Sequence, residues 1–188
     1  KLYANIGTPE EAELAKAEGA DGIGLFRTEF LYMAENGASL NAAARSFSEE
    51  TQFKAYKHVL EVMEGKPVTI RTLDAGGDKL INSVDIPLVQ EKNPLMGLRA
   101  VRLSLEFPNV LKTQLRALYR AGLYGNLRIM FPLITSVDQV KQCKQIIEEV
   151  KKELTNENIP FKEDIPVGIM IETAAAAIVS DCLANVSD

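Results

Sequence analysis

The stretch "TIRTLDAGGDK" at residues 69–79 decides the fold, because an apolar run leads there into a charged turn. Thr69 and Ile70 belong to "PVTIRTL", whose β-branched residues favour a strand over 67–73. Arg71, Asp74 and two glycines follow where a strand that simply stopped would show an ordinary turn. The pattern therefore predicts a strand that carries a cation at its carboxyl end.

Short apolar runs like this one recur along the chain and alternate with helical patterns. They predict strands at residues 2–7, 21–26, 67–73, 127–134 and 166–172. The helices expected between them start at Thr8, run over 48–63, start at Asn93, run over 108–122 and over 136–154, and end with a single helix over 174–186. Short apolar strands separated by helices are typical of an α/β protein with a parallel sheet.

Composition bounds the class of protein. The 188 residues are 46% hydrophobic, enough for one good-sized domain or a piece of a larger one. A net charge of −5 argues against general nucleic-acid binding. No apolar run is long enough to span a membrane, and the start has neither a signal-peptide pattern nor an initiator methionine. We expect a fragment of a cytoplasmic protein, with Cys143 and Cys182 as buried or half-buried reduced thiols.

Charged residues stand at the carboxyl ends of three predicted strands, namely Arg27, Arg71 and Glu172. Parallel α/β folds bind their ligands at this edge. Any one of the three has an ordinary explanation as a solvated strand end, but all three at one edge favour a site. Two guanidinium forks suit a phosphate or a carboxylate, and a glutamate suits Mg²⁺ or Mn²⁺. The set predicts phosphoryl transfer, in which charge stabilisation and alignment carry most of the catalysis.

The turn after Arg71 offers further groups to the same site. Asp74 is placed to orient Arg71 or to bind a water, and Lys79 adds a third positive charge. Gly76 and Gly77 let the backbone approach a ligand closely, although a glycine pair alone is a weak signal.

Five blocks of sequence carry a resemblance to a known family. They are "GIGLFRTEFLYM" (22–33), "TIRTLDAGGDK" (69–79), "NPLMGLRAVR" (93–102), "LRIMFPLI" (127–134) and "GIMIET" (168–173). In this order and at this spacing they resemble the phosphoenolpyruvate-binding barrel of the Enzyme I family of the bacterial sugar phosphotransferase system. The resemblance implies a TIM (β/α)8 barrel. Residues 1–188 are then one incomplete barrel domain, its N-terminal part, with about five parallel βα units.

The resemblance also implies roles for particular residues. Arg27 and Arg71 are expected to bind the phosphate of phosphoenolpyruvate, Arg99 matches another basic position near it, and Glu172 is expected to ligate Mg²⁺. In the family the phosphoryl group passes to a histidine on a separate domain and then to a small histidine phosphocarrier protein. Barrels of this family dimerise, so a homodimer is expected.

The chain departs from the family pattern in ways that bear on activity. The family continues beyond Asp188 with a Gly-Thr-Asn-Asp block that supplies a second metal carboxylate, and later with an arginine and a proton-donating cysteine. The only histidine, His58, falls in the middle of a helical pattern and reads as an ordinary surface or boundary residue. Ala174 stands where the family usually has a proline. We therefore expect half a site and no turnover by the isolated chain.

A further expectation follows from the number of strands. Five strands cannot close an eight-stranded barrel, so the chain should dimerise, swap elements or be only marginally stable.

Two other interpretations of the function stay open: a piece of a pyruvate phosphate dikinase or phosphoenolpyruvate synthase, and a non-catalytic remnant used for binding or dimerisation. The "FRTEFLYM" block favours Enzyme I over the first, and the full open reading frame would decide the second.

Overall fold

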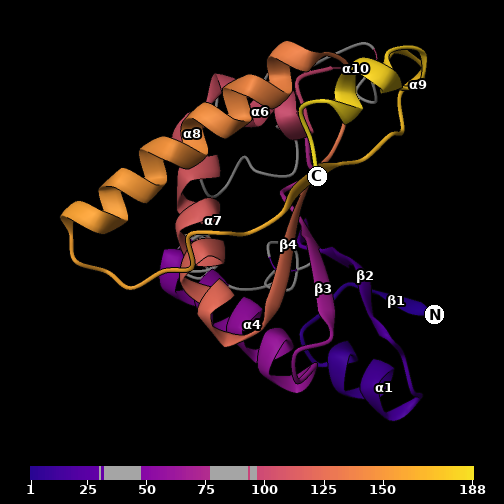
Figure 1. Cartoon of the computed structure of the whole chain (residues 1–188), viewed down its shortest axis with the longest axis vertical. Coiled ribbons are helices and arrows are strands. Elements are labelled where there is room, and N and C mark those ends of the chain that lie inside the picture. The colour runs from indigo at the N-terminus through magenta and orange to yellow at the C-terminus, as the bar shows by residue number, and fades with distance from the viewer. Residues whose placement is uncertain (30, 32–47, 77–92, 94–96) are drawn as a thin grey trace.

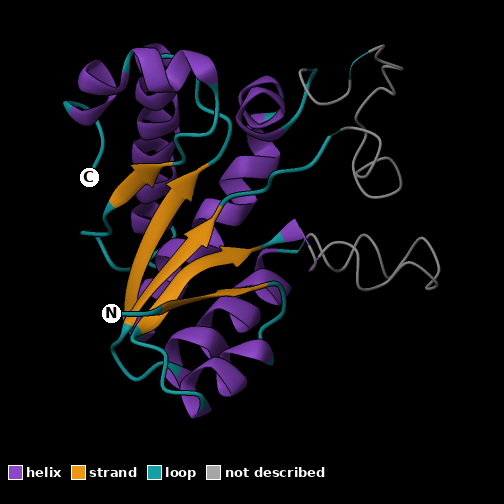
Figure 2. Ribbon diagram, turned by 90° about the vertical axis from the view of Figure 1, so that its right-hand side faces the viewer, coloured by secondary structure: helices purple, strands orange, loops and turns teal. Residues whose placement is uncertain are grey.

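A computed structural model describes residues 1–29, 31, 48–76, 93 and 97–188 of the chain. Its strands are β1 (Tyr3–Ile6), β2 (Gly22–Arg27), β3 (Pro67–Arg71), β4 (Asn126–Phe131) and β5 (Val167–Ile169). They form one parallel sheet in the order β1-β2-β3-β4-β5, and Figure 2 shows their arrows side by side. Strand order that follows chain order without reversal is that of a barrel segment, because a doubly wound sheet reverses at a switch point. The predicted α/β class with five parallel strands is confirmed.

The helices follow the strands in alternation. They are α1 (Glu11–Ala17), α4 (Glu49–Val62), α6 (Ala100–Glu106), α7 (Pro108–Ala121), α8 (Val137–Asn156), α9 (Ala174–Ile178) and α10 (Ser180–Ala184), with a 3₁₀ turn, η1, at Gly122–Tyr124. Figure 1 shows α4, α7 and α8 lying together beside the sheet, and α7 packs against both of the others. Ser48 and Ser136 cap α4 and α8 through their side-chain oxygens, as the sequence predicted for Ser136.

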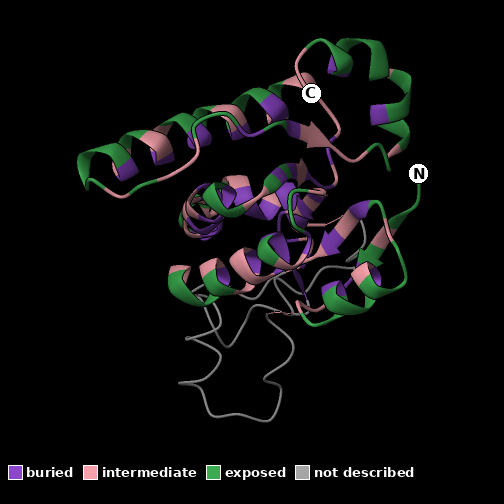
Figure 3. Ribbon diagram, turned by 60° about the horizontal axis from the view of Figure 1, so that its bottom comes forward, coloured by how far each residue is buried: buried purple, intermediate pink, exposed green. Residues whose placement is uncertain are grey.

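The core lies between the sheet and these helices. Phe26, Ile70 and Ile129 from three neighbouring strands are buried there, and Tyr56 and Leu115 come to meet them from α4 and α7. Figure 3 shows the buried residues as purple segments on the helices and strands, with exposed green segments on the outer turns. Because side chains alternate along a strand, the next residue of each strand turns to the other face of the sheet.

Some predicted elements differ from the structure. The single helix expected over 174–186 is two short helices, since Val179 has a non-helical ψ of 22° and β-branched Ile178 and Val179 favour a helix only weakly. The helix expected from Asn93 begins at Ala100 instead, and residues 94–96 lie outside the described residues. The first helix begins at Glu11, not at Thr8. The Glu11 carboxylate does reach back, accepting hydrogen bonds from the backbone N–H groups of Gly7 and Thr8.

The cysteines and the histidine occupy different environments. Cys143 is buried in α8, and burial raises the pKa of its thiol to about 12. Cys182 is exposed on α10, so the expectation that it is buried or half-buried is wrong. His58 is partly exposed, 3.4 Å from the Glu13 carboxylate, which confirms it as a boundary residue. Within the described residues, no helix has both the length and the apolar character needed to cross a membrane.

Candidate anion site at the carboxyl edge of the sheet

The carboxyl ends of β2 and β3 bring Arg27 and Arg71 side by side. The two residues are direct partners in the β2–β3 register, and Arg71 is in turn paired with Met130 of β4. Each arginine follows a fully buried residue, Phe26 or Ile70, which anchors the strand in the core on the helix side. The arginines therefore leave the strands on the opposite face, as neighbours in one row.

Two carboxylates hold the Arg71 guanidinium. Its Nη2 lies 3.1 Å from Oε1 of Glu29, and its Nη1 lies 3.2 Å from Oδ2 of Asp74. The backbone N–H of Asp74 also donates to Glu29 Oε1, at 2.8 Å. The side chains of Arg71, Glu29 and Asp74 are only 11–12% exposed, so these ion pairs are largely shielded from water. The prediction that Asp74 orients Arg71 has this contact in its favour.

Arg99 joins the same cluster from a distant part of the chain. Its Nη2 lies 2.8 Å from Asp74 Oδ1, so one carboxylate bridges the two guanidinium groups. Backbone contacts bring Arg99 there, because Gly76 and Arg99 form an isolated β-bridge and the Ala100 N–H donates to the Ala75 carbonyl. Gly77 and Lys79, which the sequence also offered to the site, lie outside the described residues.

Buried donors that lack an acceptor among the described residues of this cluster favour an added anion. Arg71 and Arg99 are ion-paired with Glu29 and Asp74, and Arg27 lies beside Arg71 in the strand register. Within the described part of the chain, the buried Nε atoms of Arg71 and Arg99 have no hydrogen-bond partner. A buried donor without a partner costs free energy, and an anion with several oxygens can supply the missing acceptors.

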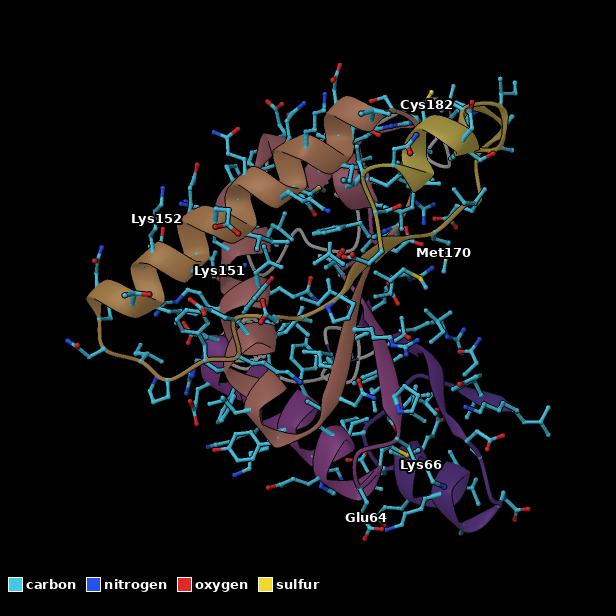
Figure 4. All side chains as sticks on the ribbon, viewed as in Figure 1. Glu64, Lys66, Lys151, Lys152, Met170 and Cys182 are labelled. Atoms are coloured by element: carbon cyan, nitrogen blue, oxygen red, sulfur yellow. The ribbon has the colours of Figure 1, made fainter. Side chains whose placement is uncertain are left out.

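The chain beyond β5 passes over the same edge. The backbone N–H of Met170 donates to the Phe131 carbonyl, and the Met170 sulfur lies 3.6 Å from Nη1 of Arg71. Figure 4 shows Met170 at this end of the sheet, with Glu64 and Lys66 at the opposite end. Glu172 follows two residues later with an exposed side chain, and its Oε1 accepts a 2.6 Å hydrogen bond from the backbone N–H of Leu133. This contact ties Glu172 to the loop after β4.

The described residues supply few ligands for a metal ion. Among them, no three His, Cys, Asp or Glu side chains gather closely enough to form a metal site. Glu172 offers one exposed carboxylate at the edge where the arginines lie. Mg²⁺ usually keeps several waters and takes one or two carboxylates together with substrate phosphate oxygens. Glu172 therefore fits an ion that arrives with a phosphate-bearing substrate better than one held by protein ligands alone.

Glu29 is a member of the cluster that the sequence pattern did not predict. It stands two residues after Arg27 in "FRTEF", and its partners Arg71 and Asp74 come from the end of the next strand. The one signal for Glu29 in the sequence is its position just beyond a predicted strand end. Arg27 and Arg71 were predicted from the same kind of position.

The fold and its charged edge are those of an α/β-barrel domain with a candidate anion site. Comparison with protein families identifies which kind of barrel domain this is. The family model for "PEP-utilising enzyme, PEP-binding domain" matches residues 1–188. The chain belongs to this family of phosphoenolpyruvate-utilising enzymes, as their phosphoenolpyruvate-binding domain. The partial TIM-barrel fold expected from the sequence is thereby confirmed.

Individual relatives agree with the family match. The chain is 48% identical over 188 residues to the phosphoenolpyruvate-protein phosphotransferase of Priestia megaterium, 44% to that of Staphylococcus carnosus (strain TM300), and 45% over 190 residues to that of Enterococcus faecalis (strain ATCC 700802 / V583). Each alignment covers the whole of this chain and 31% of the relative. The resemblance to Enzyme I is confirmed, over about a third of the length of these relatives.

Proposed function

We propose that this chain is the phosphoenolpyruvate-binding part of a phosphoenolpyruvate–protein phosphotransferase. The complete enzyme would move the phosphoryl group of phosphoenolpyruvate to a protein histidine and then to the histidine phosphocarrier protein for sugar uptake. The observation that carries the proposal is the pairing of Arg27 with Arg71 at adjacent strand ends, in a chain 48% identical to an enzyme of that name. Residues 1–188 are the N-terminal part of its barrel domain.

The arginine cluster has the donors that phosphoenolpyruvate requires. The substrate carries a phosphate and a carboxylate close together, and guanidinium groups bind both kinds of group through paired N–H donors. We assign the phosphate to Arg27 and Arg71, and we place Arg99 as a further substrate-binding residue through its link to Asp74. Glu29 and Asp74 hold the guanidinium groups in place before the substrate arrives, which lowers the entropic cost of binding.

A divalent cation is the implied cofactor. Glu172 is the residue proposed to hold Mg²⁺, with Mn²⁺ as the alternative. When bound, such an ion neutralises phosphate charge during phosphoryl transfer. The hydrogen bond from the Leu133 N–H to Glu172 fixes the carboxylate in one orientation.

The remaining parts of the proposal concern the chain as a whole. With one carboxylate assigned to the metal, the isolated chain is proposed to bind phosphoenolpyruvate weakly and to be inactive. The natural enzyme is proposed to be a cytoplasmic homodimer that has the phosphocarrier as its protein partner and does not bind nucleic acid or membranes.

The test compares the full-length gene product with the 188-residue chain. We expect phosphoenolpyruvate-dependent phosphorylation of the phosphocarrier by the full-length product and none by the isolated chain.

Arg71→Lys in the full-length product should weaken phosphoenolpyruvate binding at least tenfold, because lysine keeps the charge but loses the paired N–H donors of the guanidinium group. Arg120→Lys is the control, since Arg120 binds Glu49 and Glu50 on the helical side and should leave affinity unchanged. Equal affinity in both variants would count against the proposed site.

A further inference from the structure

A buried amide on α7 connects the helical layer to the two strand ends that carry the arginines. Gln114 is 1% exposed and uses three hydrogen-bonding positions of its side chain. Its Oε1 accepts from the backbone N–H of Leu73 at 2.9 Å. Its Nε2 donates to the Thr28 hydroxyl at 3.2 Å and to the Tyr56 hydroxyl at 3.0 Å.

Gln114 contacts residues that lie just beyond the carboxyl ends of β2 and β3. Strand β2 ends at Arg27, and Thr28 is the next residue; strand β3 ends at Arg71, and Leu73 lies just before Asp74. The Thr28 hydroxyl also donates to the Arg71 carbonyl, at 3.0 Å. One amide therefore spans the two segments from which Arg27, Arg71 and Asp74 extend.

Packing alone does not call for an amide at this position. The neighbouring buried positions of α7 are Leu111, Leu115 and Leu118, so a hydrocarbon would complete the apolar face. Burying an amide is unfavourable unless its hydrogen bonds are made, and made hydrogen bonds are directional where apolar contacts are not. The side chain thus fixes the relative placement of two backbone segments, which a leucine would not do.

We propose that Gln114 is a positioning residue for phosphoenolpyruvate: by holding Thr28 and Leu73, it sets the spacing of the Arg27 and Arg71 guanidinium groups to match one phosphate. This inference rests on the proposed function. The residue itself stays on the helix side of the sheet and acts through the backbone of its neighbours. Displacement of a positioned group by about 1 Å can cost roughly 100-fold in rate, so the expected effect is large.

The chain offers a matched control in Tyr56. Its hydroxyl accepts from Gln114 and donates to Gln52 Oε1 at 3.0 Å, and the residue is fully buried in α4. Tyr56→Phe removes a hydroxyl from the same buried network but leaves both links from Gln114 to the strand ends. Loss of stability without loss of positioning is the expected result for this variant.

The experiment measures steady-state kinetics and thermal stability of the full-length gene product. Gln114→Met and Tyr56→Phe should both lower the melting temperature. Of these two variants, only Gln114→Met should raise the KM for phosphoenolpyruvate, by about tenfold, and lower kcat/KM by about 10- to 100-fold. Thr28→Val, which removes one of the two links, should show the same change to a smaller extent.

Each outcome decides the matter. A stabilising role alone would reduce the folded fraction and leave KM unchanged, so an unchanged KM in Gln114→Met overturns the inference. If Gln114→Met does not fold, Thr28→Val decides in its place, and an unchanged KM there also overturns it. If the wild-type product neither binds nor turns over phosphoenolpyruvate, the proposed function fails first and the inference falls with it.

Discussion

At the scale of single residues, the feature that governs the candidate site is the sharing of Asp74 between two arginines. Arg71 and Arg99 would repel each other in a shielded environment if the carboxylate were absent. Its two oxygens take one guanidinium each, at 3.2 Å and 2.8 Å. The site is therefore organised by its acidic residues as much as by its basic ones.

Asp74→Asn should destabilise the fold measurably. The substitution keeps the shape of the side chain but leaves two guanidinium groups without their shared counter-charge, at an expected cost of about 3 kcal/mol in the free energy of unfolding. Urea denaturation monitored by circular dichroism measures this change. Asp138→Asn, at an exposed position in the first turn of α8, is the control, with an expected loss below about 1 kcal/mol. A loss of the same small size in both variants would contradict the ion-pair account.

The sequence predicted some members of the site and could not have predicted others. Arg27 and Arg71 were predictable because a cation directly after an apolar run is a local pattern. Gln114 was not, because its partners Leu73 and Thr28 lie 41 and 86 residues away and its neighbours form an ordinary leucine face. Such a contact exists only once the helix is packed on the sheet.

At the scale of elements, a network of ion pairs joins α4, α7 and the end of α8. Arg116 of α7 lies 2.6 Å from Glu49 of α4 and 2.6 Å from Glu157, which follows α8. The hydrogen bond from Arg116 holds the pKa of Glu157 below its usual range, and the same contact raises the pKa of Arg116. Networks in partly buried geometry contribute more than isolated surface pairs.

Arg116→Met should lower the free energy of unfolding by about 2 kcal/mol at neutral pH, because the hydrogen bonds to charged groups are lost. Lys54→Met is the control, since its 3.7 Å pair with Glu50 is exposed and should be worth less than about 0.5 kcal/mol. Chemical denaturation of both variants tests the difference. Equal losses would show that the network adds nothing beyond a surface pair.

The pH dependence of the Arg116 contribution has a definite sign. Because the pKa of Glu157 is lowered in the folded protein, its share of the stability is present above its usual pKa of 4.5 and is lost as the pH falls further. The stability gap between wild type and Arg116→Met should therefore narrow on acidification below pH 4.5. A gap that stays constant down to pH 3 would contradict this assignment.

Thiol reactivity reports on the packing of α8. Cys143 is buried with a raised pKa, and Cys182 is exposed. We expect a thiol reagent to modify the exposed Cys182 rapidly in the native chain. Cys143 should react only when the chain unfolds. Cys182→Ser should abolish the rapid phase, whereas equal reaction rates for both thiols would show that α8 is not packed as described.

The elements themselves were largely predictable from periodicity and capping residues. All five strands and the helices over 48–63, 108–122 and 136–154 match within a few residues. The errors lie where local signals are weak. The break falls at Val179, where β-branched residues favour a helix only weakly, and the chain before Ala100 is held by the bridge between Gly76 and Arg99.

At the scale of the whole molecule, the sheet of the described residues ends at β1 on one side and at β5 on the other. Within the described residues, β1 pairs only with β2, whereas β5 pairs with β4 and is bonded to Asp188, whose N–H donates to the Val167 carbonyl and whose carboxylate accepts from the Val167 N–H. Apolar side chains are exposed at Leu2, just before β1, at 80%, and at Ile178, at the end of α9, at 81%. A hollow of about 390 Å³ lies on the sheet across β3, β4 and β5 and is also lined by Asp188. Open edges and exposed apolar groups both favour association.

The 188-residue chain should therefore self-associate or unfold easily. We expect sedimentation velocity to show a concentration-dependent mixture of species at micromolar concentrations, or thermal unfolding at a low temperature. A monodisperse monomer with a high melting temperature would contradict the partial-barrel description of the isolated chain.

The proposed function requires phosphoenolpyruvate to bind at the carboxyl ends of β2 and β3. A crystal structure of the full-length gene product with phosphoenolpyruvate bound is the decisive measurement. We predict phosphate oxygens within hydrogen-bonding distance, about 3 Å, of the guanidinium groups of both Arg27 and Arg71. Phosphoenolpyruvate bound elsewhere, with these two groups turned away from it, would contradict the central claim.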